Sequence, residues 1–403
     1  MLVPHNMKGQ MVGVLGLGGS GLAAVAALKA AGAYVYAFDD VKTQQDTPQI
    51  TLTSWRDWPW ERLEAMGISP GIPHDYPMPH PAAACANSKR IPIISEVELA
   101  LRANPKARLV AITGTNGKST TTALIGHCLK SAGCSVAIGG NLGDAACSLN
   151  DPGEHGTLVL ELSSYQLETT PSLKPSISIL LNISADHLDR HGGMAGYIAA
   201  KTLILDRLDK TGIAIVGSGD QHVQTLAKIT AARGIETLIA SPDLAPIGQR
   251  GSAALAGTHN AENSAAASLA LHAIGLDDQM INHGISSFTN LPHRLQRVAS
   301  CGKVQFIDDS KATNGIAAAK ALTTFNNIYW VAGGLAKEDG LSPTMPYLGA
   351  VKKAYLIGAA APAFAASLSG ICPVAICHDL EQATRAAFDD ASADPEGGTI
   401  LLA

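Results

Sequence analysis

Twice in this chain an apolar run passes through a glycine-rich loop into an alanine- or threonine-rich segment of helical character. The first case reads V-L-G-L-G-G-S-G at residues 14–21, and the second reads I-T-G-T-N-G-K-S-T at residues 112–120. A strand that turns through glycines into a helix is the start of a βαβ unit, in which helices cover parallel strands. The repeated pattern therefore predicts an α/β fold.

The composition agrees with that fold and narrows the class of protein. Of 403 residues, 46% are hydrophobic and only 4% aromatic, while glycine occurs 40 times, which favours small-residue helices packed on sheets over an all-β sandwich. The net charge of −5 and the lack of a basic run give no footprint for nucleic acid. Seven cysteines form no C-x-x-C pair, as is typical of reduced thiols. With no signal-like start and no long apolar stretch, we expect a monomeric cytoplasmic protein that does not bind membranes.

Strand-like and helix-like segments alternate along the whole chain. Apolar runs at 12–15, 33–38, 91–94, 109–112, 158–160, 177–181, 213–216, 304–307, 328–331, 354–357 and 400–402 predict strands. Helices are predicted at 22–31, 96–103, 119–132 and 260–274. We expect three domains: a Rossmann-like domain at 1–98, a central P-loop ATPase-type parallel sheet at 99–290, and a Rossmann-like α/β domain at 291–403.

The first glycine loop contains a G-x-G-x-x-G pattern formed by Gly16, Gly18 and Gly21. This pattern seats a pyrophosphate at a helix N-terminus, and Asp39, after the next predicted strand, lies where a ribose hydroxyl is usually bound. Taken alone, the pattern is typical of NAD binding. A tight turn without any ligand is the other interpretation, and the pattern does not choose the nucleotide.

The second glycine loop departs from the general P-loop, because Ile112 stands where that pattern has its first glycine. Gly114 and Gly117 remain to present backbone N–H groups, Lys118 supplies a cation for phosphates, and Ser119 supplies a hydroxyl for Mg²⁺. A strand before the loop and a helix after it favour ATP binding over a solvated turn.

Acidic and histidine side chains follow the next two central strands. Glu161 ends one strand in E-L-S-S-Y-Q-L-E, and Asp186 and His187 follow another in N-I-S-A-D-H-L-D-R-H. Ligands of α/β sheets gather at the carboxyl ends of strands, and hard carboxylate oxygens suit Mg²⁺. These residues predict a magnesium site beside the phosphates.

Together with G-T-H-N-A-E-N, L-P-H-R and D-D-S-K-A-T-N, these motifs resemble the Mur ligase family, in matching order from about residue 12 to the end. The resemblance implies three α/β domains that bind, in turn, a uridine nucleotide, ATP and an amino acid. The G-L-G-G-S-G and S-P-G-I-P segments are similar to the member that adds D-glutamate to UDP-N-acetylmuramoyl-L-alanine. The D-N-P-R signature of the sibling that adds a diamino acid is absent.

The resemblance implies an ATP-dependent carboxylate–amine ligase of peptidoglycan precursor synthesis that works through an acyl phosphate. A sibling ligase, such as folylpolyglutamate synthase, and a catalytically inactive nucleotide-binding relative are the alternatives. The family continues beyond its last strand into a loop that grips the D-glutamate side chain, whereas this sequence ends at L-L-A. We therefore expect a truncated C-terminal domain in which the site for D-glutamate is incomplete.

The resemblance also assigns roles to individual residues. The cofactors it implies are ATP and two Mg²⁺ ions, with Lys201 carbamylated, although a lysine on an alanine-rich helix is by itself typical of a surface charge. The implied catalytic residues are Lys118, Glu161, His187, Lys201 and Lys311. The implied metal ligands are Ser119, Glu161, His187 and Lys201. The implied ATP-binding residues are Gly114, Thr115, Asn116, Gly117, Lys118, Ser119, Thr120, Asn260, Asn263, Arg294 and Asp309. The implied ligands of the UDP substrate are Gly19, Ser20, Asp39, Gly71, Asn141 and His187, and those of D-glutamate are Thr313 and Lys337.

Overall fold

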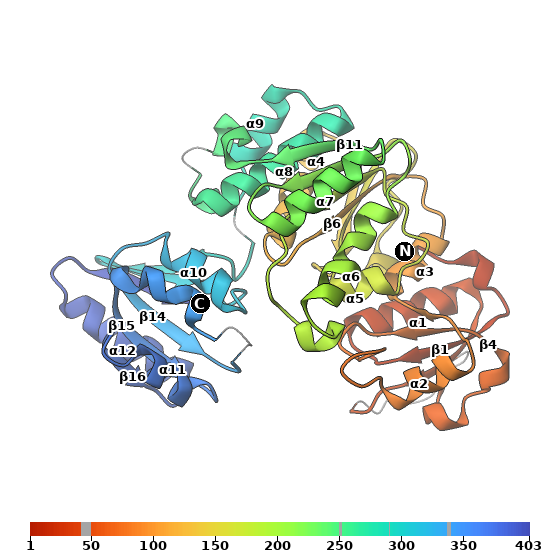
Figure 1. Cartoon of the computed structure of the whole chain (residues 1–403), viewed down its shortest axis with the longest axis horizontal. Coiled ribbons are helices and arrows are strands. Elements are labelled where there is room, and N and C mark those ends of the chain that lie inside the picture. Colours follow the sequence, from red (N-terminus) through yellow and green to blue (C-terminus); the bar gives the residue numbers. More distant parts are fainter. Residues whose placement is uncertain (42–49, 250–251, 290, 337–339) are drawn as a thin grey trace. The chain divides into compact units, whose positions relative to one another are not determined.

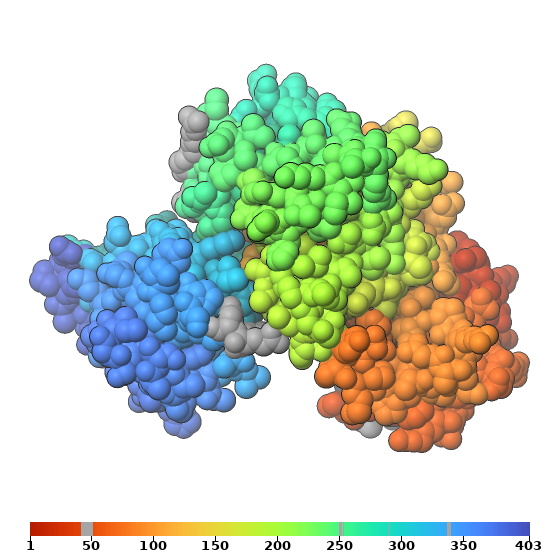
Figure 2. Space-filling view, in the orientation of Figure 1, coloured from red at the N-terminus to blue at the C-terminus, as the bar shows by residue number. Residues whose placement is uncertain are grey.

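The computed structural model describes residues 1–41, 50–249, 252–289, 291–336 and 340–403 (Figure 1). Backbone contacts divide the chain into two compact units. The first unit comprises Met1–Gly248 and Glu262–Ile285, and the second comprises Gln249–Ala261 and Ser286–Ala403. The first unit holds two sheets and the second holds one, and side chains fill the spaces between the ribbons of each unit (Figure 2).

The first sheet is parallel, with the strand order β3-β2-β1-β4-β5. Its strands are β1 (Met11–Leu15), β2 (Tyr34–Phe38), β3 (Ile50–Leu52), β4 (Leu63–Ile68) and β5 (Ile93–Ile94). Its helices are α1 (Gly19–Ala31), α2 (Pro81–Ser88) and α3 (Glu96–Arg102). β4 was not predicted, because Glu64 and Gly67 interrupt its apolar pattern.

The second sheet is also parallel, with the order β11-β10-β9-β6-β8-β7. Its strands are β6 (Arg108–Thr113), β7 (Val136–Gly140), β8 (Thr157–Glu161), β9 (Ile177–Leu180), β10 (Ile213–Gly217) and β11 (Glu236–Ala240). The accompanying helices are α4 (Lys118–Ser131), α5 (Ser164–Glu168), α6 (Met194–Asp206), α7 (Gln221–Ala232), α8 (Thr258–Ile274) and α9 (Asp278–Ser286). Because β6 lies between β8 and β9, the phosphate loop and both acidic motifs leave the sheet side by side.

The third sheet has the order β12-β13-β17-β14-β15-β16. Its strands are β12 (Gln296–Cys301), β13 (Val304–Asp308), β14 (Ile328–Gly333), β15 (Val351–Ile357), β16 (Val374–Ile376) and β17 (Gly398–Leu402). Its helices are α10 (Gly315–Leu322), α11 (Ala361–Leu368) and α12 (Leu380–Ala393). β12 pairs antiparallel with β13, whereas the other neighbours in this sheet are parallel.

Within the first unit, a polar network around the buried Glu98 carboxylate joins α3 to the segment after α5. The Glu98 carboxylate accepts hydrogen bonds from the Arg102 side chain and from the backbone N–H of Ser172, both at 2.9 Å. The backbone N–H of Ser95 donates to the Thr169 carbonyl at 2.8 Å. Because a buried charge is stable only when it is paired and hydrogen-bonded, this network fixes the end of the first sheet against the second.

The α/β class and the parallel sheets confirm the fold prediction. Each sheet falls within one predicted domain, but the boundaries at residues 98 and 290 stay predictions, and residue 290 lies outside the described residues. In the described part of the chain, no helix combines the length and the apolar character needed to cross a membrane.

Candidate active site

The loop after β6 is held in a shape that requires glycine. Gly114 and Gly117 have φ angles of +154° and +87°, a region that favours glycine. A Cβ atom at Gly117 would lie 2.3 Å from Oδ1 of Asn263, so the predicted ATP-side Asn263 does approach this loop. Asn182 clamps the loop from β9, since its side chain accepts from the Asn116 N–H and donates to the Asn116 carbonyl, both at 2.9 Å.

Lys118 begins α4 and folds back over the loop. Its Nζ donates to the carbonyl oxygens of Gly114 and Thr115, each at 2.9 Å. Ser119 lies buried in the first turn of the same helix, and Thr120 follows it, half-buried. A cation and the N–H groups of a helix N-terminus thus face the same point, which is a favourable environment for phosphate oxygens.

Lys201 on α6 is buried, with only 1% of its surface exposed. Its Nζ donates to the Gly114 carbonyl at 2.8 Å and lies 4.7 Å from the centre of the Tyr197 ring. Burial, together with the positive charge of Lys118, holds the pKa of Lys201 well below its ordinary value, although Asp186 and Glu161 act in the opposite direction. The surface-charge interpretation of Lys201 is therefore wrong.

Glu161 ends β8 with 1% of its surface exposed. Oε1 accepts from Nδ2 of Asn141 at 2.8 Å, whereas the buried Oε2 has no hydrogen-bond partner among the described residues. A buried carboxylate oxygen without a donor is unfavourable, and a cation such as Mg²⁺ would satisfy it. Within the described ranges, no three His, Cys, Asp or Glu side chains form a metal cluster by themselves, so hydroxyl, water and phosphate oxygens would have to complete the coordination.

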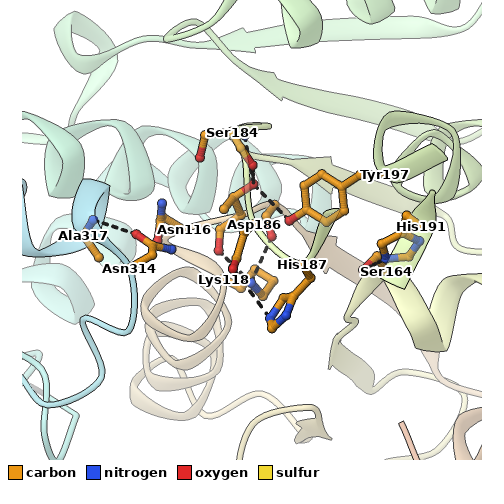
Figure 3. A network of polar contacts seen from close by, with 12 residues as sticks. Asn116, Lys118, Ser164, Ser184, Asp186, His187, His191, Tyr197, Asn314 and Ala317 are labelled. Atoms are coloured by element: carbon orange, nitrogen blue, oxygen red, sulfur yellow. Dashed lines mark hydrogen bonds and ion pairs between the residues drawn. The ribbon is translucent and has the colours of Figure 1, made fainter. Parts of the chain in front are cut away.

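His187 follows β9 with a left-handed backbone, at φ +56°, which is uncommon outside glycine. Its Nε2 lies 3.7 Å from a carboxylate oxygen of Asp186, and its ring meets the edge of Tyr165 with centroids 5.6 Å apart. Figure 3 shows His187, Asp186 and Lys118 converging on one place.

A pocket of about 200 Å³ lies among these groups. It brings together six of the predicted site residues from both sheets of the first unit, namely Gly71, Lys118, Asn141, Asp186, His187 and Lys201. Its other lining residues are Pro70, Ser163, Ser164, Tyr165 and Tyr197. Arg190 supports the position of the loop at Gly71, because it donates to the Gly71 carbonyl at 3.1 Å and lies over the Tyr165 ring at 4.5 Å.

The first glycine loop is built for a close approach of backbones. A Cβ atom at Gly21 would lie 1.8 Å from the Gly16 carbonyl oxygen, so only glycine fits there. The Asp39 carboxylate accepts from the backbone N–H of Leu17 at 2.6 Å and so holds this loop. A Cβ atom at Gly19 would meet nothing within 4 Å, which leaves open space at the start of α1 beside Ser20.

The second unit carries the remaining predicted residues. Burial raises the pKa of Asp309 to about 6, against the lowering effects of the Leu295 N–H, which donates to it at 2.9 Å, and of Arg294. Lys311 and Thr313 are exposed, and Thr313 lines a pocket of about 380 Å³ beside Asn314, Trp330 and Gly333. Asn260 is buried and donates to the Ala256 carbonyl at 2.9 Å, whereas Lys337 lies outside the described residues.

Besides Pro70, Ser163 and Ser164, four residues that shape the first-unit pocket were not predicted as site residues. Asn182 and Arg190 fix the two loops, and Tyr165 and Tyr197 form its walls. Asn182, Tyr165 and Arg190 stand inside motifs singled out from the sequence, which was the available signal. Tyr197 carries no sequence signal, because its hydroxyl reaches Thr115, at 3.1 Å, only through the packing of α6.

Comparison with known proteins places this site in a family. Residues 112–243 match the Mur ligase middle domain, and residues 293–403 match the Mur ligase glutamate ligase domain. The UDP-N-acetylmuramoylalanine–D-glutamate ligase of Rhodospirillum rubrum is 40% identical over 433 residues, covering 100% of this chain and 91% of the relative. The enzyme of the same name from Paramagnetospirillum magneticum is 41% identical, covering 98% of this chain and 91% of the relative.

Solved structures share the fold at low sequence identity. The UDP-N-acetylmuramate-alanine ligase MurC of Thermotoga maritima is 19% identical with a TM-score of 0.61, covering 97% of this chain and 94% of its own. The MurF ligase of Thermotoga maritima, solved in complex with ADP, is 17% identical with a TM-score of 0.58, covering 100% of this chain and 92% of its own.

Proposed function

This chain belongs to the Mur ligase family, and from that premise we propose that it joins D-glutamate to the carboxylate of UDP-N-acetylmuramoyl-L-alanine at the expense of ATP. The product is an amide of a peptidoglycan precursor. The observation that carries the proposal is the pocket in which Lys118, Asn141, His187 and Lys201 meet beside the buried Glu161 carboxylate, in a chain 40% identical to ligases of that name.

The reaction requires a phosphoryl transfer to a carboxylate followed by an acyl transfer to an amine. The alanyl carboxylate attacks the γ-phosphorus of ATP, the bond to the bridging oxygen breaks, and an acyl phosphate and ADP result. The D-glutamate amine then attacks the acyl carbon, and the tetrahedral intermediate expels phosphate while the nitrogen loses its proton. Because carboxylate, ATP and acyl phosphate are all negative, the main work of the protein is to position them and neutralise their charge. Lys118 provides that charge at the phosphate loop.

Magnesium, if bound at this site, would supply further positive charge to offset that of the phosphate groups. Ser119, Glu161 and His187 are the residues we assign to two such ions. The unpartnered Oε2 of Glu161 supports this assignment, because a bound cation would remove the cost of its burial. Asn141 fixes the orientation of the carboxylate through its bond to Oε1.

We assign a carbamylated amine to Lys201. Carbon dioxide adds only to a neutral amine, and the burial of Lys201 beside Lys118 favours that neutral form. The carbamate would replace a cation by a carboxylate-type oxygen ligand for the second Mg²⁺. Lys201→Ala should lose most activity and regain part of it with acetate, whereas Lys201→Arg should be inactive and beyond rescue. Protein equilibrated with ¹³C-bicarbonate should show a carbamate signal that the Lys201→Arg variant lacks, and its absence from the parent would overturn this assignment.

The first glycine loop is assigned to the UDP end of the acceptor. Gly19 and Ser20 border open space at the start of α1, and Asp39 holds the loop through Leu17. Gly71 and Asn141 are assigned to the muramoyl-alanine end, because both line the pocket that contains Lys118. A UDP-sugar should therefore bind and NAD should not.

The second unit is assigned to the remaining ligand contacts by family resemblance. Arg294, Asp309 and Lys311 are assigned to ATP and the transferred phosphate, Asn260 and the first-unit Asn263 to the adenine side, and Thr313 with Lys337 to D-glutamate. The pocket that Thr313 lines supports a small-molecule role for this unit.

The deciding experiment is phosphate release from ATP with UDP-N-acetylmuramoyl-L-alanine and each candidate amino acid in turn. We expect release that depends on D-glutamate; dependence on another amino acid would identify a sibling ligase, and no release would identify an inactive relative. Lys118→Ala should reduce turnover by about 10²–10³-fold, as loss of one charge-stabilising group typically does. Lys130→Ala, an exposed lysine on the same helix, is the matched control and should retain the parental rate.

A further inference from the structure

Behind the first-unit pocket, three side chains are linked in a row by polar contacts, and the mechanism above does not use them. Oγ of Ser164, which lines the pocket, is 2.9 Å from Nε2 of His191. Nδ1 of His191 is 3.3 Å from Oε1 of Glu168. The His191 side chain is completely buried, so this ring acts on ligands only through its neighbours. Figure 3 shows Ser164 and His191 side by side.

Elementary chemistry decides which of these three side chains donates each hydrogen bond. The Glu168 carboxylate only accepts hydrogen bonds, so in the neutral form of His191, on which the proposal rests, the proton lies on Nδ1. Nε2 is then an acceptor, and the Ser164 hydroxyl must donate its proton to it. With its proton engaged, Ser164 presents lone pairs alone to the pocket.

Aromatic packing and charge hold this arrangement in place. The His191 ring stacks on Tyr165 at a centroid distance of 5.1 Å and an interplanar angle of 7°, and this packing favours the observed ring orientation. Glu168 also faces His74, whose Nε2 lies 3.5 Å from Oε2. The serine thus differs from an ordinary hydroxyl, because it cannot freely rotate to become a donor.

We propose that Ser164 is the hydrogen-bond acceptor for the alanyl amide N–H of the acceptor substrate, and that His191 and Glu168 are positioning residues that fix its polarity. The proposal rests on the assigned ligase function. Within a pocket of about 200 Å³, the cation of Lys118 attracts the alanyl carboxylate. The amide nitrogen is only two bonds from that carboxylate carbon, and it is a donor that cannot accept. The Ser164 oxygen, a fixed acceptor in the same small pocket, is therefore a suitable partner for that amide N–H.

The test compares two acceptors, the natural amide and an ester analogue in which L-lactate replaces L-alanine, so that oxygen replaces the N–H. The wild-type protein should have a kcat/KM for the amide that is higher by about tenfold or more, because the ester oxygen places its lone pairs against those of the Ser164 hydroxyl. Ser164→Ala should lower kcat/KM for the amide by about tenfold and bring the amide/ester ratio close to one. The KM for ATP should change little.

Two variants of His191 separate positioning from folding. His191→Gln can still donate to Glu168 and accept from Ser164, so it should keep most of the amide/ester preference. His191→Phe keeps a ring against Tyr165 but frees the Ser164 hydroxyl, so it should lose the preference while melting at a similar temperature.

Failure of the Ser164 contact can be told apart from failure of the assigned ligase function. If the wild-type protein does not ligate the amide substrate at all, the assigned function fails. If it does, and Ser164→Ala keeps the wild-type amide/ester ratio, the contact with the alanyl N–H is overturned, even where the rate has fallen. A His191→Phe variant with an unchanged ratio would overturn the positioning role of His191.

Discussion

The buried carboxylate of Glu96 should make the stability of the protein depend on pH, by an amount that follows from its surroundings. Glu96 is the first residue of α3, and 3% of its surface is exposed. Oε1 accepts from the backbone N–H of Cys147, while the buried Oε2 has no partner within the described residues. Burial raises its pKa from 4.5 to about 7, although the hydrogen bonds from Cys147 act in the opposite direction.

The sign of the effect on stability follows from the two states of the chain. Below about pH 4.5 the carboxyl is protonated whether the chain is folded or not, so burial of charge costs nothing. Between about pH 4.5 and 7 only the unfolded chain releases the proton, so the free energy of unfolding falls as pH rises. The raised pKa corresponds to a loss of roughly 3 kcal/mol that is complete above about pH 7.

The substitution Glu96→Gln removes the charge and keeps an oxygen that accepts from Cys147. Its free energy of unfolding relative to wild type should therefore increase by roughly 3 kcal/mol between about pH 4.5 and 8. Urea unfolding followed by tryptophan fluorescence at a series of pH values measures this difference. Glu154→Gln, at an exposed position, should show a difference that does not vary with pH. The reasoning would be refuted if the difference in the free energy of unfolding between Glu96→Gln and wild type stayed constant with pH, or if it decreased as pH rises.

Three further predictions concern the loops, the thiols and the nucleotide. Gly117→Ala should abolish ATP-dependent activity and destabilise the first unit by about 1–3 kcal/mol, because φ is +87° and the new Cβ would meet Asn263; a variant with parental turnover would contradict the loop geometry. At pH 8 a thiol reagent should modify the exposed Cys301 at once but Cys128 only after unfolding, since burial raises the pKa of Cys128 to about 12; mass spectrometry of the labelled peptides decides this. Calorimetry should show binding of a UDP-sugar and no binding of NAD, and tight NAD binding without a response to the UDP-sugar would sink the assignment of the first loop.

The sequence was most informative where glycine marks the end of a strand. β1 and β6 and the helices after them were predicted within a few residues, because a strand, a glycine loop and a helix leave a local pattern. β11 and β12 were not predicted, since β11 is half exposed and β12 is polar and exposed. The antiparallel pairing of β12 depends on contacts with β13 that no local pattern reports.

The site shows the same division between local and tertiary information. Lys118 was predicted from its own loop, whereas the burial of Lys201 arises because α6 packs its side chain beneath that loop. Residues alone indicated a surface lysine at 201, and only family resemblance suggested otherwise. His191 acts through Ser164, 27 positions away, and a contact of that kind has no signature in a single sequence.

The adjacency of β8, β6 and β9 has a consequence for how such a protein can change. Each of these strands ends in a loop that borders the site, and the loops are tied together, because Asn182 after β9 is hydrogen-bonded to Asn116 in the loop after β6. A substitution in one of these loops therefore disturbs its neighbour as well. The residues assigned to D-glutamate lie instead in the second unit, so a lineage built on this fold can exchange the incoming amine there while the loops that activate a carboxylate are inherited unchanged.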